Sequence, residues 1–579
     1  MINEPHHDRY GESQAWTEPR SWFVRWTDLV LLIGVAGVFL GAVQVGRTWV
    51  GEHRAAVEID LSPWRLPEYT FFSLSRGLIA YVLSLGFTLA YGWWAAKDKI
   101  AARVLLPLLD ILQSIPVLGF MPGLMVAFVA LFPGSNVGLE LVAIIMIFTG
   151  QVWNMTFSFY HSLRSIPTEM KEVARVYGFT TWQRFKWLEL PFSMIGLVWN
   201  SMMSMAGGWF FLMINEAFQL GDRDFRLPGV GSYMSVAVER GDVPAMVYAV
   251  IAMTIMILAL DQLLWRPIVV WAQKFRVEEG ADVEEPQSWF LTWLRRSWFV
   301  EVVGGWIGRW LPRRSERPAK VQHAAPRRWP LAAWLRPIPL VLLVGVLLWG
   351  AVGLFDLLKD VTWSMWLDLG LSTLVTMARV LLAVAIGTLW AVPAGLAIGL
   401  SPKWSQRLQP VVQIVASFPA PMLFPVVLAL LDVLNVSLSW GAIALMLLGT
   451  QWYLLFNVMA GAMAIPADLK EMATSYRIRG WQRFTTLYFP AVFPYLVTGW
   501  VTAAGGAWNA SIVAEFVTFR SETLQTYGIG ARITEAAEAG NFSHLAAGVI
   551  AMSLVVVLFN RMVWQPCYRL AERKYSLNK

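Results

Sequence analysis

Long apolar stretches recur along this chain, and they constrain its fold more than any other feature. An α-helix needs about 20 predominantly apolar residues to cross the hydrocarbon core of a bilayer. With 57% hydrophobic and 15% charged residues, the sequence is too apolar for an ordinary water-soluble globule. We predict an all-α polytopic membrane protein with about twelve transmembrane helices. The predicted spans are 28–47, 72–96, 104–132, 138–160, 191–215, 243–269, 331–355, 369–400, 405–431, 437–462, 490–514 and 544–566.

The second half of the sequence repeats the first. Residues 166–191 read IPTEMKEVARVYGFTTWQRFKWLELP, and residues 465–490, 299 positions later, read IPADLKEMATSYRIRGWQRFTTLYFP. This register continues beyond the loop, and upstream the offset becomes 303, so that Arg76 aligns with Arg379. Because six spans return the chain to the side on which it started, we predict two parallel six-helix repeats of equal orientation.

The predicted organisation follows from these spans and from the basic residues. It comprises an N-terminal tail (1–27), a first repeat (28–270), a linker (271–330), a second repeat (331–568) and a C-terminal tail (569–579). Lys and Arg gather between the second and third spans and in the linker, which places both tails and the linker in the cytoplasm. Within the linker, Ser288–Trp310 combines tryptophans with arginines and favours an amphipathic helix on the inner membrane surface; a soluble inter-domain helix is the alternative.

Composition excludes several other classes of protein. The net charge of +7 is explained by cytoplasmic loops of a membrane protein, so nucleic acid is not a predicted partner. A single cysteine, Cys567, leaves no internal disulfide or cysteine-based metal site, and the histidines lack ligand spacing. The polar N-terminus has no apolar region of the kind found in a cleaved signal peptide.

The repeated loop is a charged interruption in an apolar sequence. Pro167 suits the first turn of a helix and Gly178 suits its C-terminal cap, which predicts a short helix that projects into the cytoplasm. Its polar faces and the small Ala174 favour docking of a partner from water. A partner that grips such a rigid helix could move the attached membrane helices.

These residues resemble the EAA loop of binding-protein-dependent ABC importer permeases, in which a coupling helix seats in the ATPase subunit. The first loop fits the pattern at Glu172, Ala174, Gly178, Leu190 and Pro191, with Val173 at the usual second Ala. The second loop fits at Glu471, Ala473 and Pro490, whereas Met472 and Arg477 depart from it, so that Gly480 is the alternative end of a longer helix. The residues expected to dock an ATPase are Glu169, Lys171, Glu172, Ala174, Arg175, Gly178, Lys470, Glu471, Ala473, Tyr476, Arg477 and Gly480.

Three further features repeat in both halves: an arginine early in the second span, a proline-rich third span, and a glutamate followed by Gly-x-Gly after the fifth span. With these features the chain is similar to one branch of that family, the nitrate, sulfonate, taurine and bicarbonate permeases, in a duplicated form. The resemblance implies the type I ABC importer permease fold, a bacterial inner membrane location, two ATPase subunits and a periplasmic solute-binding protein. The chain has no Gly-Lys dipeptide and hence no phosphate-binding loop. ATP and Mg²⁺ would therefore bind to the partner ATPases, and this chain is expected to hold no cofactor.

Two further groups of residues are candidates for a transport path. Side chains within the spans could line it, namely two arginines, two tryptophans and an asparagine: Arg76, Arg379, Trp209, Trp508 and Asn509. The alternative is that they pack the bundle, with the arginines paired to carboxylates such as Asp110. A second group follows the fifth span of each half and could form an outer gate or contact the binding protein: Glu216, Glu515, Gly229, Gly231, Gly528 and Gly530. The alternative is that the glutamates are ordinary solvated carboxylates and that the glycines form a tight extracellular turn.

Other functional classes remain as alternatives. A secondary transporter with two parallel repeats would also give twelve spans, but it would leave the duplicated loop unexplained. An ABC permease that serves export or sensing would share the architecture. A membrane enzyme is disfavoured, because the sequence shows no nucleophile–base or metal-binding constellation.

Overall fold

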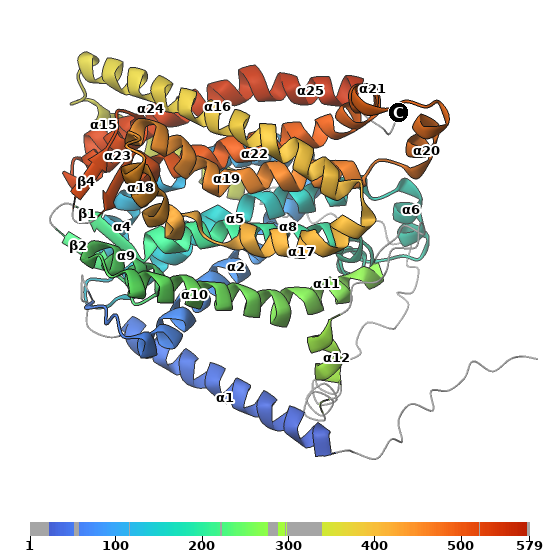
Figure 1. The fold of residues 1–579 in the computed structure, drawn as a ribbon, viewed down its shortest axis with the longest axis horizontal. Coiled ribbons are helices and arrows are strands. Elements are labelled where there is room, and N and C mark those ends of the chain that lie inside the picture. The colour runs from blue at the N-terminus through green and yellow to red at the C-terminus, as the bar shows by residue number, and fades with distance from the viewer. Residues whose placement is uncertain are drawn as a thin grey trace, which may run out of the picture.

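The computed structural model is a bundle of long helices (Figure 1). It describes residues 22–50, 57–114, 116–220, 223–275, 288–295, 297, 338–519 and 522–575. The expected N-terminal tail up to residue 21, most of the linker and the last four residues lie outside the described part. Of the amphipathic helix predicted at Ser288–Trp310, only the segment that includes α12 (Trp289–Arg295) is described.

The first half alternates long spans with short connecting elements. Its long helices are α1 (Trp22–Val50), α2 (Leu66–Lys97), α3 (Lys99–Ser114), α4 (Met121–Leu131), α5 (Val137–Ser165), α8 (Leu190–Asn215) and α10 (Val243–Leu260). The shorter elements are α6 (Thr168–Val176), α7 (Thr181–Arg184), β1 (Ala217–Leu220), β2 (Arg223–Arg226), α9 (Val230–Arg240) and α11 (Arg266–Ala272).

The second half has the same order of elements. Its long helices are α15 (Ile338–Leu358), α16 (Trp363–Gly399), α17 (Pro402–Ser417), α18 (Phe424–Val433), α19 (Leu438–Met463), α22 (Phe489–Ala514) and α24 (Phe542–Phe559). The shorter elements are α20 (Ala467–Ser475), α21 (Gly480–Arg483), β3 (Phe516–Phe519), β4 (Glu522–Gln525), α23 (Ile529–Glu538) and α25 (Gln565–Lys574).

The chain is a multi-pass membrane protein. Among the described residues, nine helices are long and apolar enough to cross a bilayer, and ten if the bent pair α17–α18 counts as one span. The two further predicted spans coincide with α3–α4 and α15, neither of which passes that test. The predicted third span of each half is not one straight helix. It breaks before a 3₁₀ turn, at Val117–Phe120 and Ala420–Leu423, because Pro116 and Pro419 cannot continue the helical hydrogen-bond ladder.

The two ends of the bundle differ in their short elements. The β1–β2 and β3–β4 hairpins lie at one end, and α6 and α20 lie at the other (Figure 1). Each hairpin is antiparallel, with Ala217 opposite Arg226 and Phe516 opposite Gln525. The sequence did not predict these hairpins, because strands of four residues carry too little periodicity to stand out.

The broken third spans join the two halves. α3 and the 3₁₀ turn that follows it pack against α24 of the second half, while α17 packs against α8 and α10 of the first. Buried residues of both halves therefore form one large hydrophobic core. These contacts between the two halves bring residues from distant parts of the sequence around a common centre.

Candidate functional site

The two loop helices, α6 and α20, end in the same way. Both have nine residues and follow a proline, Pro167 or Pro466. Gly178 closes α6 with φ of 65°, and Arg477 closes α20 with φ of 54°. The next amide donates to the carbonyl of Ala174 or Ala473, at 3.0 and 2.9 Å. The alternative that α20 runs on to Gly480 is therefore wrong, because Arg477 adopts the left-handed conformation that glycine usually supplies.

The outward faces of these helices are accessible. Glu172 and Glu471 are exposed and make no hydrogen bond or ion pair with any described residue. Ala174 and Ala473 are only 3% and 2% exposed, so their side chains do not lie on the accessible face of either helix. The remaining docking candidates are exposed or half-buried: Glu169, Lys171, Arg175, Gly178, Lys470, Tyr476, Arg477 and Gly480.

Exposed aromatic side chains flank the same helices, and the sequence reasoning missed most of them. Tyr177 is 70% exposed and Tyr476 is 75% exposed, while Trp182 and Trp481 are 67% and 75% exposed. Because each pair repeats at the 299-residue offset, the identity of these positions in the two loops was the available signal. Exposed apolar groups that gather at one place mark a site of interaction with another protein or with the membrane.

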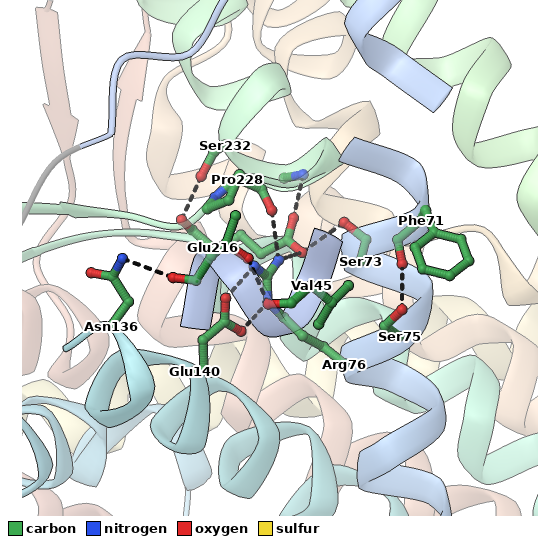
Figure 2. Close-up of polar contacts among 12 residues, drawn as sticks. Val45, Phe71, Ser73, Ser75, Arg76, Asn136, Glu140, Glu216, Pro228 and Ser232 are labelled. Carbon is green, nitrogen blue, oxygen red and sulfur yellow. Dashed lines mark hydrogen bonds and ion pairs between the residues drawn. The ribbon is translucent and has the colours of Figure 1, made fainter. Parts of the chain in front are cut away.

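At the hairpin end, Arg76 lies between two buried carboxylates. Its Nε and Nη2 donate to Glu140 at 2.5 and 2.7 Å, and its Nη1 donates to Glu216 at 2.7 Å. Figure 2 shows the guanidinium held between the two acids. Nη1 also donates to the carbonyl of Pro228 at 2.9 Å, and Ser73 donates to Glu216 at 2.6 Å. We call these residues the Arg76 cluster.

The corresponding Arg379 cluster has only one carboxylate. Nη1 of Arg379 donates to Glu515 at 2.7 Å and to the carbonyl of Tyr527 at 2.8 Å. Nη2 donates to the hydroxyls of Thr526 at 3.0 Å and Ser439 at 3.5 Å. Ser439 stands at the position of Glu140 in the 299-residue register, so a hydroxyl replaces the second acid.

The Gly-x-Gly pairs serve these clusters and do not form the expected tight turn. Gly229 and Gly528 have extended backbones and precede α9 and α23. A Cβ at either glycine would lie 2.2 Å from a carboxylate oxygen of Glu216 or Glu515. The second glycines contribute their amides, because Gly231 donates to Glu216 at 2.7 Å and Gly530 donates to Glu515 at 2.9 Å.

Neither arginine lies where a path residue was expected. Arg76 and Arg379 are 1% and 7% exposed and ion-paired within the bundle. Glu216 and Glu515 are both fully buried, so they are neither solvated carboxylates nor able to touch a partner in this conformation. The alternative of bundle packing through carboxylates describes the arginines, although the partners are Glu140, Glu216 and Glu515.

A cavity of about 530 Å³ lies between the two halves. Among the predicted path residues, Trp508 and Asn509 line it, whereas Trp209 is buried against Gly77. Asn509 accepts a hydrogen bond from the amide of Val117 at 2.7 Å, which ties α22 to the broken third span of the other half. None of the described residues that line the cavity carries a charge.

The cavity extends toward the end that carries α6 and α20. Its lining includes Thr450 in the middle of α19 and Met463, the last residue of that helix, shortly before α20. The buried Arg76 and Arg379 clusters lie toward the opposite end. No group of three His, Cys, Asp or Glu side chains able to hold a metal ion occurs in the part of the chain that the structure describes.

Comparison with known proteins identifies two matching regions. The family model described as "Binding-protein-dependent transport system inner membrane component" matches residues 85–264 and again residues 383–563. These two regions correspond to the two repeats.

Curated relatives are similar over about one repeat each. The nitrate import permease protein NrtB of Leptolyngbya laminosa is 30% identical over 184 residues, 31% of this chain and 62% of that protein. The bicarbonate transport system permease protein CmpB of Synechocystis sp. is 26% identical over 34% of this chain and 67% of its own length. The glycine betaine/carnitine transport permease protein GbuB of Listeria monocytogenes is 26% identical, with 35% and 66% covered.

Proposed function

The chain belongs to the family of binding-protein-dependent transport system inner membrane components, and on that premise we propose that it is the permease of an ATP-driven importer for a small anion. Both halves of the translocation path would come from this one chain, since both repeats match the family. The protein would act in a bacterial inner membrane, with both termini in the cytoplasm. Its own role is transport, and ATP hydrolysis belongs to separate subunits.

The observation that carries this proposal is the pair of loop helices. α6 and α20 project at the same end of the bundle (Figure 1). Each carries an exposed glutamate with no ion-pair partner among the described residues, and each is flanked by an exposed tyrosine. Each is followed closely by the membrane helix α8 or α22. Two ATPase subunits that grip these helices could therefore transmit their movement directly to the helices around the cavity.

The energy source follows from what the sequence lacks. Without a phosphate-binding loop, the chain needs partner subunits that hold ATP and Mg²⁺. Closure of those subunits around ATP would draw α6 and α20 together. The path would then change from a state open at the cytoplasmic end, which matches the extent of the cavity, to one open at the hairpin end.

The solute would pass through the central cavity beside Trp508 and Asn509. The ion pairs of the Arg76 and Arg379 clusters would keep the outer end of the path closed, and Glu216 and Glu515 would belong to the outer gate. A solute-binding protein would deliver the anion over the hairpins. The anion class rests on the similarity to the nitrate and bicarbonate permeases.

Replacing Glu172 and Glu471 together by alanine tests the function. We expect the double variant to fold normally, because both side chains are exposed, but to lose the ATPase and ATP-dependent uptake. The measurement is affinity purification of the full chain from its own membranes, with mass spectrometry of the subunits that accompany it.

A matched control replaces two exposed carboxylates elsewhere, Asp360 in a turn and Glu522 at the start of β4, which should leave ATPase association unchanged. Normal ATPase association and uptake in the Glu172/Glu471 variant would refute the proposal. A secondary transporter would show uptake that is insensitive to ATP, and an exporter would show ATP-driven movement in the opposite direction.

A further inference from the structure

A buried glutamate joins the first repeated loop to the membrane helix α2. Glu189 ends the π-helical segment Phe185–Glu189, directly before α8, and is only 3% exposed. Its carboxylate accepts hydrogen bonds from Nζ of Lys97, the last residue of α2, and from Nε1 of Trp93, one turn earlier, at 3.1 Å. Nε of Arg184 lies 3.4 Å from the same carboxylate. The acid thus binds one cation from α2 and one from the loop.

Apolar side chains connect this site to the loop helix α6. Met170 on α6, Phe185 and Trp93 pack against one hydrophobic cluster, which includes the buried Leu163 of α5. The rings of Trp93 and Phe185 meet edge to face, with their centroids 6.4 Å apart. Apolar surfaces can slide past each other, whereas separating a buried carboxylate from its cations is costly. A displacement of α6 should therefore carry the end of α2 with it, because Glu189 holds the two together.

α2 reaches from this site to the Arg76 cluster. It is a helix of 32 residues without an internal proline, and it carries both Arg76 and Lys97. At 1.5 Å per residue, these two side chains start about 30 Å apart along the helix. Buried carboxylates thus bind α2 near both of its ends: Glu189 at the loop end, and Glu140 and Glu216 at the hairpin end. A movement of the loop end can therefore reach the hairpin end through one continuous element.

The second half replaces this charged contact by apolar packing. Under the two offsets, apolar or aromatic residues align with Trp93, Lys97 and Glu189, and they pack in one hydrophobic cluster: Leu396, Leu400 and Tyr488. Arg483, the counterpart of Arg184, stacks on that tyrosine and donates to the carbonyl of Lys470, on α20 itself, at 3.2 Å.

The long helices of the two halves also differ near this end. α16 contains Pro393 in its interior, where α2 has Ala90 under the 303-residue offset. A proline inside a helix removes one hydrogen bond of the ladder and favours a kink. α16 is therefore less suited than α2 to pass a movement along its length, which agrees with the loss of the charged contact at its loop end.

We propose that Glu189 is the positioning residue that transmits movement of α6 to α2, and through α2 to the Arg76 cluster. The inference rests on the proposed permease function and assigns a role in coupling to a residue outside α6 and α20. The two loops then act unequally. The first moves α2 through a buried charged contact, whereas Arg483 ties α20 to its own π-helical segment and so to α22.

The test measures the response of the outer end to ATP in the complex that the chain forms with its ATPases, reconstituted in lipid nanodiscs. The single cysteine, Cys567, is replaced by serine, and spin labels are attached through Trp64→Cys and Leu367→Cys. Both positions are exposed, beside the start of α2 and near the start of α16. Double electron–electron resonance gives the distance between the labels without nucleotide and after trapping with ATP and vanadate. ATP hydrolysis is measured on the same samples, and no transported solute is needed.

Single substitutions test the charge of Glu189. Glu189→Gln keeps an oxygen that accepts from Trp93 but removes the charge that binds Lys97 and Arg184. We expect ATP hydrolysis to continue, while the fraction of complexes that reach the trapped distance falls at least about fivefold. Glu189→Asp keeps the charge and should recover part of the response. Tyr488→Phe, at the aligned position of the second half, is the matched control and should change neither measurement, since it removes only a hydroxyl.

A triple variant separates the charged contact from packing: Trp93→Leu with Lys97→Leu and Glu189→Tyr. It introduces the residues that already pack together in the second half, so it should fold and still recruit the ATPases. This variant keeps the test decisive if Glu189→Gln fails to fold. We expect it to hydrolyse ATP with the same reduced response at the outer end. A wild-type response in the triple variant would refute the role of Glu189.

The remaining outcomes distinguish the inference from the function on which it rests. An unmodified chain that recruits no ATPase, or whose outer end does not respond to ATP, refutes the permease function and the inference with it. A complex that responds equally with and without Glu189→Gln refutes the inference alone. Loss of ATPase binding or of ATP hydrolysis in a folded Glu189→Gln complex would also refute it, because a residue that only transmits movement leaves both intact.

Discussion

The Arg76 and Arg379 clusters hold the same place in the two halves but use different chemistry. In the first, the guanidinium meets two buried carboxylates, Glu140 and Glu216. In the second, Glu515 is the only acid, and the hydroxyls of Ser439 and Thr526 complete the shell. Since a buried charge that loses its partner is costly, the first cluster should be the more sensitive to change. The two clusters thus share a position in the fold but differ in the groups that bind the arginine, and so in how much each should stabilise the protein.

Removing each arginine is the strongest way to test this comparison. Arg76→Met leaves two buried carboxylates without a cation, so we expect a loss of about 3–5 kcal/mol or failure to fold. Arg379→Met leaves one carboxylate that still accepts from Thr376 at 2.8 Å, so its cost should be smaller. Thermal unfolding of the purified chain in detergent measures both. Equal losses would contradict the difference between the clusters.

Exchanging the second acid tests its specific role. Glu140→Ser removes two charge-assisted hydrogen bonds and should cost about 2–3 kcal/mol. The second half tolerates serine because Thr526 supplies a hydroxyl, where the first half has Leu227. The double variant Glu140→Ser with Leu227→Thr should therefore recover part of the loss. If the double variant is less stable than Glu140→Ser alone, the hydroxyl shell is not the substitute that we infer.

The glycines beside the two acids should respond alike, which makes them an internal control. Gly229→Ala and Gly528→Ala each place a Cβ 2.2 Å from a carboxylate oxygen. Because the carboxylate must move in either case, we expect about 1–3 kcal/mol of destabilisation for both. The same unfolding experiment measures it. A neutral Gly528→Ala would show that the Arg379 cluster is the looser of the two.

The smallest predicted effects concern the caps of α6 and α20. Gly178→Ala forces a side chain into the left-handed region and should cost about 1 kcal/mol, while Arg477→Gly should relieve a similar strain. Hydrogen exchange of the Phe179 and Ile478 amides, which close the two caps, reports the change locally. Faster exchange at Ile478 in Arg477→Gly would show that the arginine side chain itself stabilises the cap.

Repeat matching predicted much of the fold and only part of the site. The spans, the loop helices and the alignment of Arg76 with Arg379 in the repeat all follow from apolar runs and from the two offsets. Glu140 was missed because it interrupts the repeat, and a residue present in one copy carries no signal in such a comparison. Its partner could only emerge from the packing of α5 against α2.

The cavity could not be predicted from the sequence either. It depends on α17 packing against α8 and on the turn after α3 packing against α22, contacts that cross between the repeats. Gln409 and Gln413 line the cavity only because these contacts bring α17 beside α8. Likewise, the Gly-x-Gly pairs suggested a turn, because sequence alone does not reveal a carboxylate that needs the space of a missing Cβ.

Short π-helical segments add a constraint on how the chain can change in length. Phe185–Glu189 and Phe484–Tyr488 precede α8 and α22, and Asp261–Trp265 and Asn560–Trp564 follow α10 and α24. Each accommodates one extra residue, and each α-helical residue turns the chain by about 100°. A single-residue deletion at Phe484–Tyr488 would restore a regular α-helix but rotate α20 away from its present direction. Keeping the 299-residue spacing at both pairs of π-helical segments therefore preserves the rotational position of α6 and α20 relative to the membrane helices. Insertions or deletions of single residues in these segments should be among the least tolerated.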